Sequence, residues 1–93
     1  MAAIGDRVVP SPLIVAQKMD KGAILMDTHS GECFELNAVG SCVWSGIERG
    51  DSFDVIAQDL ATQYRIPSAR ARADMDSLVL ELLRVGIVRP PEP

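Results

Sequence analysis

Residues 31–44, GECFELNAVGSCVW, contain both a strand and the start of a helix, and this stretch decides the fold. Apolar and polar side chains alternate in its CFEL segment, a two-residue period that is typical of a β-strand. The alternation places Phe34 and Leu36 on one face of the strand and Cys33 and Glu35 on the other. The stretch therefore predicts a two-sided strand that leads directly into a helix.

Asn37 marks the change from the strand period to the helix period. Its short side-chain oxygen suits an N-cap, which accepts a hydrogen bond from an amide of the first helical turn. Apolar residues, Trp44 among them, then recur at three- and four-residue steps as far as Gly50, where a helix is expected to end. We interpret Trp44 as a core residue. Gly40 and Gly46 each cost a helix ~1 kcal/mol relative to Ala, which indicates a close approach to the sheet.

The chain before this stretch predicts two more strands and an arm. Leu13–Met19 and Ala23–Thr28 are apolar or mixed in character, and residues with turn composition follow each. With Glu32–Leu36 they form a three-stranded antiparallel meander, because the connections are too short for parallel crossovers. Residues 1–12 hold two X-Pro pairs, which disfavour helix, and are predicted to form a flexible N-terminal arm.

The chain after this stretch predicts two more helices. Asp51 or Ser52 caps the second helix, which the connection Arg65–Pro67 ends. Ser68 caps a third helix that runs to about Val85. Three strands followed by three helices make an α+β domain related to winged helix-turn-helix folds.

Length, composition and charge limit the classes of protein to which the chain can belong. Its 93 residues, 47% of them hydrophobic and 24% charged, suit one soluble domain, which we place at residues 13–88, with a C-terminal tail at 89–93. A net charge of −4 disfavours nucleic acid as a partner. The sequence contains no apolar run near the roughly 18 residues of a membrane span and no secretory signal. We expect a cytoplasmic protein with no membrane partner.

The third helix carries more apolar surface than one core can cover. At about 100° per residue its apolar side chains sweep roughly 220° of the helix surface. This arc holds Val85, Leu78, Ala71, Leu82, Met75, Val79, Leu83 and Leu80. If Met75, Leu78 and Leu82 face the body, then Val79, Leu80 and Leu83 form an exposed shoulder. Arg72 and Asp76 border this shoulder, as charges border a partner-binding groove. Cover by the first helix, the arm or a second copy is an equal alternative.

Patterns for catalysis and metal binding are absent from the sequence. His29 is the single histidine and falls in a predicted turn, where a solvated side chain is favoured over a general base. His29, Cys33 and Cys42 lack the spacing of a zinc site, and the chain has no glycine-rich phosphate loop. We therefore predict no enzyme, no metal and no cofactor. The spacing of Cys33 and Cys42 does not exclude a disulfide, but a reducing compartment favours two free thiols.

Two binding functions fit this architecture. A DNA-binding protein would place the third helix in a major groove, but Asp74, Asp76 and Glu81 would then approach the phosphates. A peptide-binding protein would instead pair an extended ligand with the edge of the strand Glu32–Leu36 and insert its side chains into a neighbouring groove. We favour peptide binding, and DNA binding is the minor hypothesis.

The order of three segments resembles the PqqD-like family, the RiPP recognition elements. The segments are SGECFELNAVGSCVW, ERGDSFDVIAQDLATQY and ADMDSLVLELLRVGIV. They match that family in a strand that ends in Leu-Asn, a helix rich in small residues, a Gly followed by Ser, and a last helix that closes on Gly and an apolar residue. The resemblance covers residues 13–88. Trp44 and the segment Gly50–Ser52 look most like the standalone lasso-peptide members.

The resemblance implies a non-catalytic module that binds the leader of a ribosomally made precursor peptide and presents it to partner enzymes. For the lasso type these partners are a cysteine protease that acts as leader peptidase and an ATP-dependent cyclase. A chaperone for a radical enzyme, as in the pyrroloquinoline quinone branch, is the alternative. Carried over by position, the leader lies along Cys33, Phe34 and Glu35. The resemblance also sets it against the third helix, at the shoulder Val79, Leu80 and Leu83 and the bordering residues Arg72 and Asp76. Which face of the strand meets the leader stays open.

Overall fold

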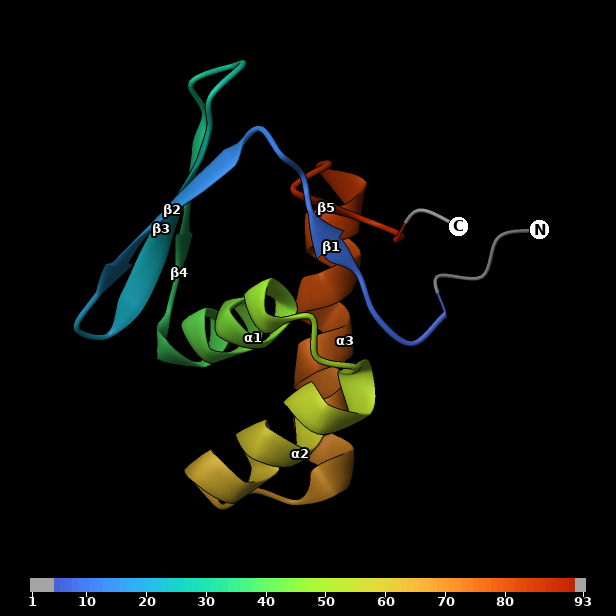
Figure 1. The fold of residues 1–93 in the computed structure, drawn as a ribbon. Coiled ribbons are helices and arrows are strands. Elements are labelled where there is room, and N and C mark those ends of the chain that lie inside the picture. The colour runs from blue at the N-terminus through green and yellow to red at the C-terminus, as the bar shows by residue number, and fades with distance from the viewer. Residues whose placement is uncertain (1–4, 92–93) are drawn as a thin grey trace.

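The computed structural model describes residues 5–91, so the parts of the predicted arm and tail at residues 1–4 and 92–93 lie outside it. Within residues 5–91 the chain forms two small sheets and three helices (Figure 1). The elements in order are β1 (Val9–Pro10), β2 (Ile14–Met19), β3 (Gly22–Asp27), β4 (Cys33–Leu36), α1 (Ala38–Arg49), α2 (Phe53–Tyr64), α3 (Ser68–Arg84) and β5 (Val88–Arg89). This is the predicted α+β architecture.

The larger sheet is the predicted antiparallel meander, with strand order β2-β3-β4. In the ladder between β3 and β4, Ala23 pairs with Leu36 and Leu25 pairs with Phe34. These four side chains share the face that the helices cover, since Ala23, Leu25 and Leu36 are buried and Phe34 is half-buried. β4 is thus an edge strand whose inner face closes the core.

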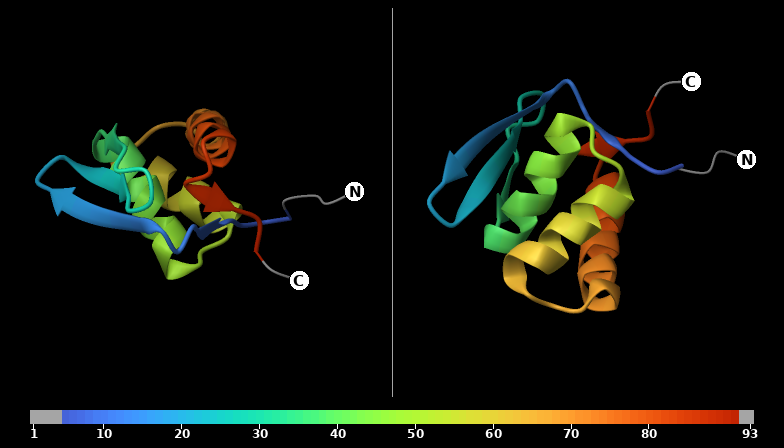
Figure 2. Two further views of the ribbon diagram at one scale, coloured as in Figure 1. Left: turned by 90° about the horizontal axis from the view of Figure 1, so that it is seen from above. Right: turned by 60° about the horizontal axis from the view of Figure 1, so that its bottom comes forward.

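α1 begins and ends where the sequence predicts. The Asn37 side-chain oxygen accepts a hydrogen bond from the Gly40 backbone N–H at 2.8 Å, and Gly50 ends the helix in the left-handed conformation, with φ 83°. Trp44 is 1% exposed, which confirms it as a core residue. α1 lies between the larger sheet and α3, and therefore forms the centre of the molecule (Figure 2).

Glycines of α1 permit two different close contacts. A Cβ added at Gly40 would lie 3.3 Å from the Leu36 Cβ at the end of β4, which agrees with the predicted approach to the sheet. A Cβ added at Gly46 would lie 2.6 Å from Cγ1 of Ile56 in α2. The prediction is therefore wrong for Gly46, because the turn of α1 that carries it packs against a helix.

The caps of α2 and α3 differ in kind. Ser52 Oγ accepts a hydrogen bond from the Val55 backbone N–H at 3.2 Å, and Arg65 ends α2 with φ 54°. Pro67, with an extended ψ of 146°, occupies the N-cap position of α3, and no side chain caps that helix. The predicted Ser68 cap is wrong by one residue, because the chain is already helical at Ser68.

The segment before β2 packs onto the body. Val9 pairs with Arg89 and Pro10 with Val88 in a two-stranded antiparallel sheet, and Val8 is 1% exposed. Figures 1 and 2 show β1 and β5 side by side next to α3. The predicted loose arm is therefore wrong for Val8–Pro10, and the predicted tail is wrong for Arg89. Each strand is only two residues long, too short to give a periodic signal in the sequence.

Candidate functional site

The outer edge of β4 presents unpaired backbone groups. Asp27 N–H donates to the Glu32 carbonyl at 2.9 Å, which makes that pair a hydrogen-bonded pair of the antiparallel ladder. Because such pairs alternate with non-hydrogen-bonded ones, Phe34 and Leu36 bond to β3. The backbone N–H and C=O groups of Cys33 and Glu35 consequently point away from β3. No strand of the described chain pairs with this edge.

A groove lies beside this edge. Its volume is about 560 Å³, and it is bounded by β4, the first turns of α1 and one side of α3. The lining residues are Glu35, Leu36, Asn37, Val39, Gly40, Val43, Asp74, Ser77, Leu78 and Glu81. The groove lining combines apolar and polar residues, as sites for peptide side chains do.

α3 turns a different side to this groove than the sequence predicted. Met75 and Leu82 face the body, as expected, but Val79 is also buried, with 4% of its surface exposed. Leu83 is half-buried against the core. Leu80 is 62% exposed, and it is the only one of the three shoulder residues that is exposed. The exposed shoulder predicted at these residues is therefore wrong. Leu78, predicted to face the body, lines the groove.

The position of α2 explains this difference. Arg72 Nη1 lies 2.6 Å from the Asp54 carboxylate in α2, and Arg72 Nε lies 3.3 Å from Asp76. The hydrogen bond to Asp54 is the main reason that the pKa of Arg72 is raised above its ordinary value. At about 100° per residue Val79 lies next to Arg72 on the α3 surface. α2 thus covers the side that the sequence interpretation left open.

Of the residues predicted to bind peptide, the structure brings only three to the edge and groove. Glu35 lines the groove, and Cys33 and Phe34 lie beside it in β4. The α3 residues that line the groove, and that the sequence interpretation did not select, are Asp74, Ser77, Leu78 and Glu81. The predicted residues Arg72, Asp76, Val79, Leu80 and Leu83 are not among its lining residues. The helical period places residues 74, 78 and 81 on one side of α3, at three- and four-residue steps, but it does not indicate that this side faces β4.

The ionisable side chains of the groove are all acidic. Asp74 lies 3.7 Å from Arg70, and Glu81 pairs with Arg84. Glu35 is exposed and has no ion-pair or hydrogen-bonding partner among residues 5–91. Exposed pairs of this kind neutralise charge weakly, so the groove favours cationic over anionic groups.

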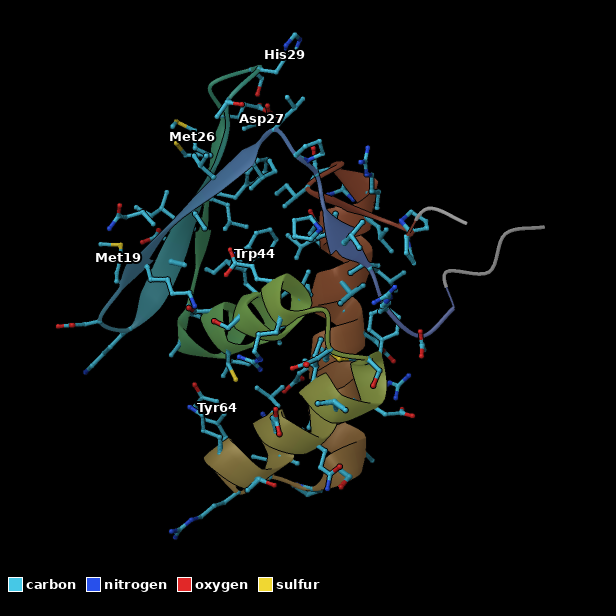
Figure 3. The ribbon with its side chains drawn as sticks, viewed as in Figure 1. Met19, Met26, Asp27, His29, Trp44 and Tyr64 are labelled. Carbon is cyan, nitrogen blue, oxygen red and sulfur yellow. The ribbon has the colours of Figure 1, made fainter. Side chains whose placement is uncertain are left out.

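The face of the larger sheet away from the helices is partly apolar. Val15, Met26 and Cys33 stand opposite one another in register on three adjacent strands. Val15 is 49% exposed and Met26 is 39% exposed, and Figure 3 shows Met19 and Met26 on the side away from the helices. No other described element covers this face, so it is continuous with the open edge of β4.

A second hollow of about 600 Å³ lies on the other side of α1, between the turn that joins β2 to β3 and α2. The Cys42 thiol faces it and donates a hydrogen bond to the Gln63 side-chain oxygen at 3.4 Å. Burial raises the pKa of the Cys42 thiol above its ordinary value. Cys33 and Cys42 are both free, so they do not form a disulfide.

His29 is exposed at the tip of the turn between β3 and β4 (Figure 3). The described side chains include no group of three or more His, Cys, Asp or Glu placed to hold a metal ion. None of the helices within residues 5–91 has the length and apolar character needed to cross a bilayer.

Comparisons with known proteins agree with this fold. The sequence model of the family described as coenzyme PQQ synthesis protein D (PqqD) matches residues 22–88, which include β4, α1 and α3. A search of curated proteins gives no match. A structure of TbiB1 in complex with the TbiA(beta) leader peptide has a TM-score of 0.83 and 22% identity, covering 91% of this chain and 99% of that one. A lasso peptide synthetase B1 complexed with the leader peptide has a TM-score of 0.82 and 28% identity, covering 90% and 99%. Because the family match spans well over half of its length, the chain belongs to the PqqD family.

Proposed function

We propose that this protein is a leader-peptide recognition module in the biosynthesis of a ribosomally made peptide. The leader binds as an added strand along β4 and places alternate side chains in the groove between β4 and α3. The observation that carries this proposal is the open β4 edge directly beside that groove. The two structural relatives support it, because both are described as complexes with leader peptides.

Strand addition supplies affinity that does not depend on the ligand sequence. The N–H and C=O groups of Cys33 and Glu35 offer four backbone hydrogen bonds, each worth about 0.5–1.5 kcal/mol. Leu78 and Val39 offer an apolar contact for a side chain that points into the groove. Burial of one apolar ligand side chain adds about 1.5–3 kcal/mol, before the cost of ordering the peptide. These gains fit a specific but reversible complex.

The module acts without chemistry of its own and holds the leader for partner enzymes. For lasso-peptide maturation the partners are a leader peptidase of the cysteine-protease type and an ATP-dependent cyclase. The description of one structural relative as a lasso peptide synthetase B1 complexed with the leader peptide supports the lasso type. The match to the coenzyme PQQ synthesis protein D family favours a second candidate, a peptide chaperone for a radical enzyme. DNA binding is disfavoured, because α3 exposes Asp74, Asp76 and Glu81.

Amide hydrogen exchange tests the proposed site. The probe is the leader of a precursor peptide encoded next to this gene, and a scrambled peptide of equal composition is the control. The leader should slow the exchange of the Cys33 and Glu35 amides, which point to the open edge. The Phe34 amide already bonds to β3 and should change little. Binding without protection of Cys33 and Glu35 would contradict strand addition, and no binding to any neighbouring precursor would contradict the function.

The gene neighbourhood distinguishes the two candidate pathways. A cysteine protease and an asparagine-synthetase-like cyclase beside this gene would favour lasso maturation. A radical enzyme in their place would favour the chaperone. Reconstitution of leader cleavage with and without this chain then tests the choice directly, because a presenting module should increase the cleavage rate without cleaving the leader by itself.

A further inference from the structure

Two side chains of β4 would stand next to a ligand strand on the outer face of the sheet. Cys33 and Glu35 alternate with Phe34, which faces the helices. In the register between β3 and β4, Cys33 lies opposite Met26 and Glu35 lies opposite Ile24. Because a strand added at this edge continues the pleat, its outward residues would extend these two rows.

The two rows differ in chemistry. Continued into β2, the Cys33 row holds Met26 and Val15, so all three of its side chains are apolar or weakly polar. The Glu35 row holds Ile24 and Gln17. Within the three strands of this sheet, Glu35 is the only charged side chain on the outer face, and no described residue pairs with it.

We propose that Glu35 is a specificity-determining residue that selects a basic side chain on the ligand strand. This inference rests on the proposed function. The ligand residue two positions away lies beside Cys33, at the end of the row that continues into Met26, and is apolar. The residue between them points inward, toward Leu78 and Val39 in the groove, and is also apolar. The recognised segment is thus three consecutive residues, basic, apolar and apolar, in an order set by the direction of the added strand.

The physical basis is the cross-strand pair. Side chains directly opposite on neighbouring strands have Cβ atoms about 4.5–5.5 Å apart, so opposite charges attract and like charges repel. Glu35 is free to form such a pair, whereas Asp74 and Glu81 already have Arg70 and Arg84 beside them. A basic ligand residue at this position would therefore meet Glu35, the one of these three carboxylates that lacks a counter-charge among residues 5–91.

Panning a random peptide display library tests this inference without knowledge of the natural precursor. The library carries linear peptides long enough to span β4, and the targets are the wild-type chain, Glu35→Lys and Glu48→Lys. Glu48→Lys is the matched control, because it makes the same change in net charge on α1, where Glu48 lies 3.9 Å from Lys18. Circular dichroism establishes that each exposed-site variant keeps its fold.

We expect panning on the wild-type chain and on Glu48→Lys to enrich peptides with a basic residue next to an apolar pair. Panning on Glu35→Lys should enrich an acidic residue at the same position. Exchange of Lys for Glu in a selected peptide should weaken wild-type binding by about 3- to 10-fold and strengthen Glu35→Lys binding. An identical consensus on all three targets overturns the role of Glu35 but leaves strand addition intact. Failure to enrich any peptide that protects the Cys33 amide overturns the proposed function as well.

Discussion

A proline at Cys33 would remove a backbone donor from the open edge of β4 without breaking a hydrogen bond between β4 and β3. The Cys33 N–H points away from β3, according to the alternation set by the hydrogen bond from Asp27 to Glu32. Proline lacks this N–H, and its loss breaks no hydrogen bond within the sheet. Edge strands tolerate proline at positions where the N–H faces solvent. Cys33→Pro should therefore fold normally and bind the leader poorly.

The size of the effect follows from one lost hydrogen bond. A ligand carbonyl left without its donor at a partly desolvated edge costs about 1–3 kcal/mol. This is about a 5- to 150-fold increase in Kd, to which the ring adds steric hindrance. Calorimetric titration with a neighbouring precursor leader measures the loss, and thermal unfolding measures whether the fold survives.

Ala16→Pro is the matched control on the opposite edge. Thr28 N–H donates to the Leu13 carbonyl at 2.8 Å, so by the same alternation Ala16 in β2 also turns its N–H to an open edge. Ala16→Pro should bind the leader as the wild-type protein does. The reasoning is refuted if Cys33→Pro is folded and binds with unchanged affinity, or if both prolines weaken binding equally.

Four further predictions concern the groove, Gly46 and Cys42. Leu78→Asp should raise the Kd for the leader about 10- to 100-fold in a fluorescence titration, because it removes the apolar groove contact. Leu80→Asp is the control and should leave the Kd unchanged, because Leu80 is 62% exposed. The reverse result would favour the shoulder predicted from the sequence. Gly46→Ala should lower the free energy of unfolding by about 1–2 kcal/mol, because the cost of overpacking against α2 is larger than the gain in helix propensity. A higher Tm measured by circular dichroism would contradict this. Alkylation should be slower at Cys42 than at Cys33, because the raised pKa leaves less thiolate. The neutral Cys42 thiol stabilises the fold below the ordinary thiol pKa of about 8.5 and loses this effect at higher pH, so Cys42→Ser should flatten the decline in stability there.

The elements and their order could be predicted because their signals are local. The alternation in residues 33–36 follows from the two-residue period of a strand, and the Asn37 cap follows from its short oxygen acceptor. Gly50 ends α1 because glycine adopts a positive φ at little cost. Trp44 could be assigned to the core because it lies on the apolar stripe of α1. Each of these predictions requires only neighbouring residues in the chain.

The short strands β1 and β5 could not be predicted in this way. Val9–Pro10 pairs with Val88–Arg89, and almost the whole chain separates them. Two-residue strands carry no period, and Pro10 by itself indicates an irregular segment. Only the folded chain brings these segments together, and Val8 and Val88 are buried there.

The candidate site divides along the same line. The sequence by itself determined that β4 is a two-sided strand and that α3 has more apolar surface than one core can cover. It could not determine which side of α3 stays open, because the helical period gives the angles between side chains but not the direction of the neighbouring helix. The tertiary structure decided this: α2 packs on the side of Arg72 and Val79, and the side of Leu78 faces β4. The groove beside β4 therefore depends on the position of α2. The residues that line the groove carry no local signal of that position.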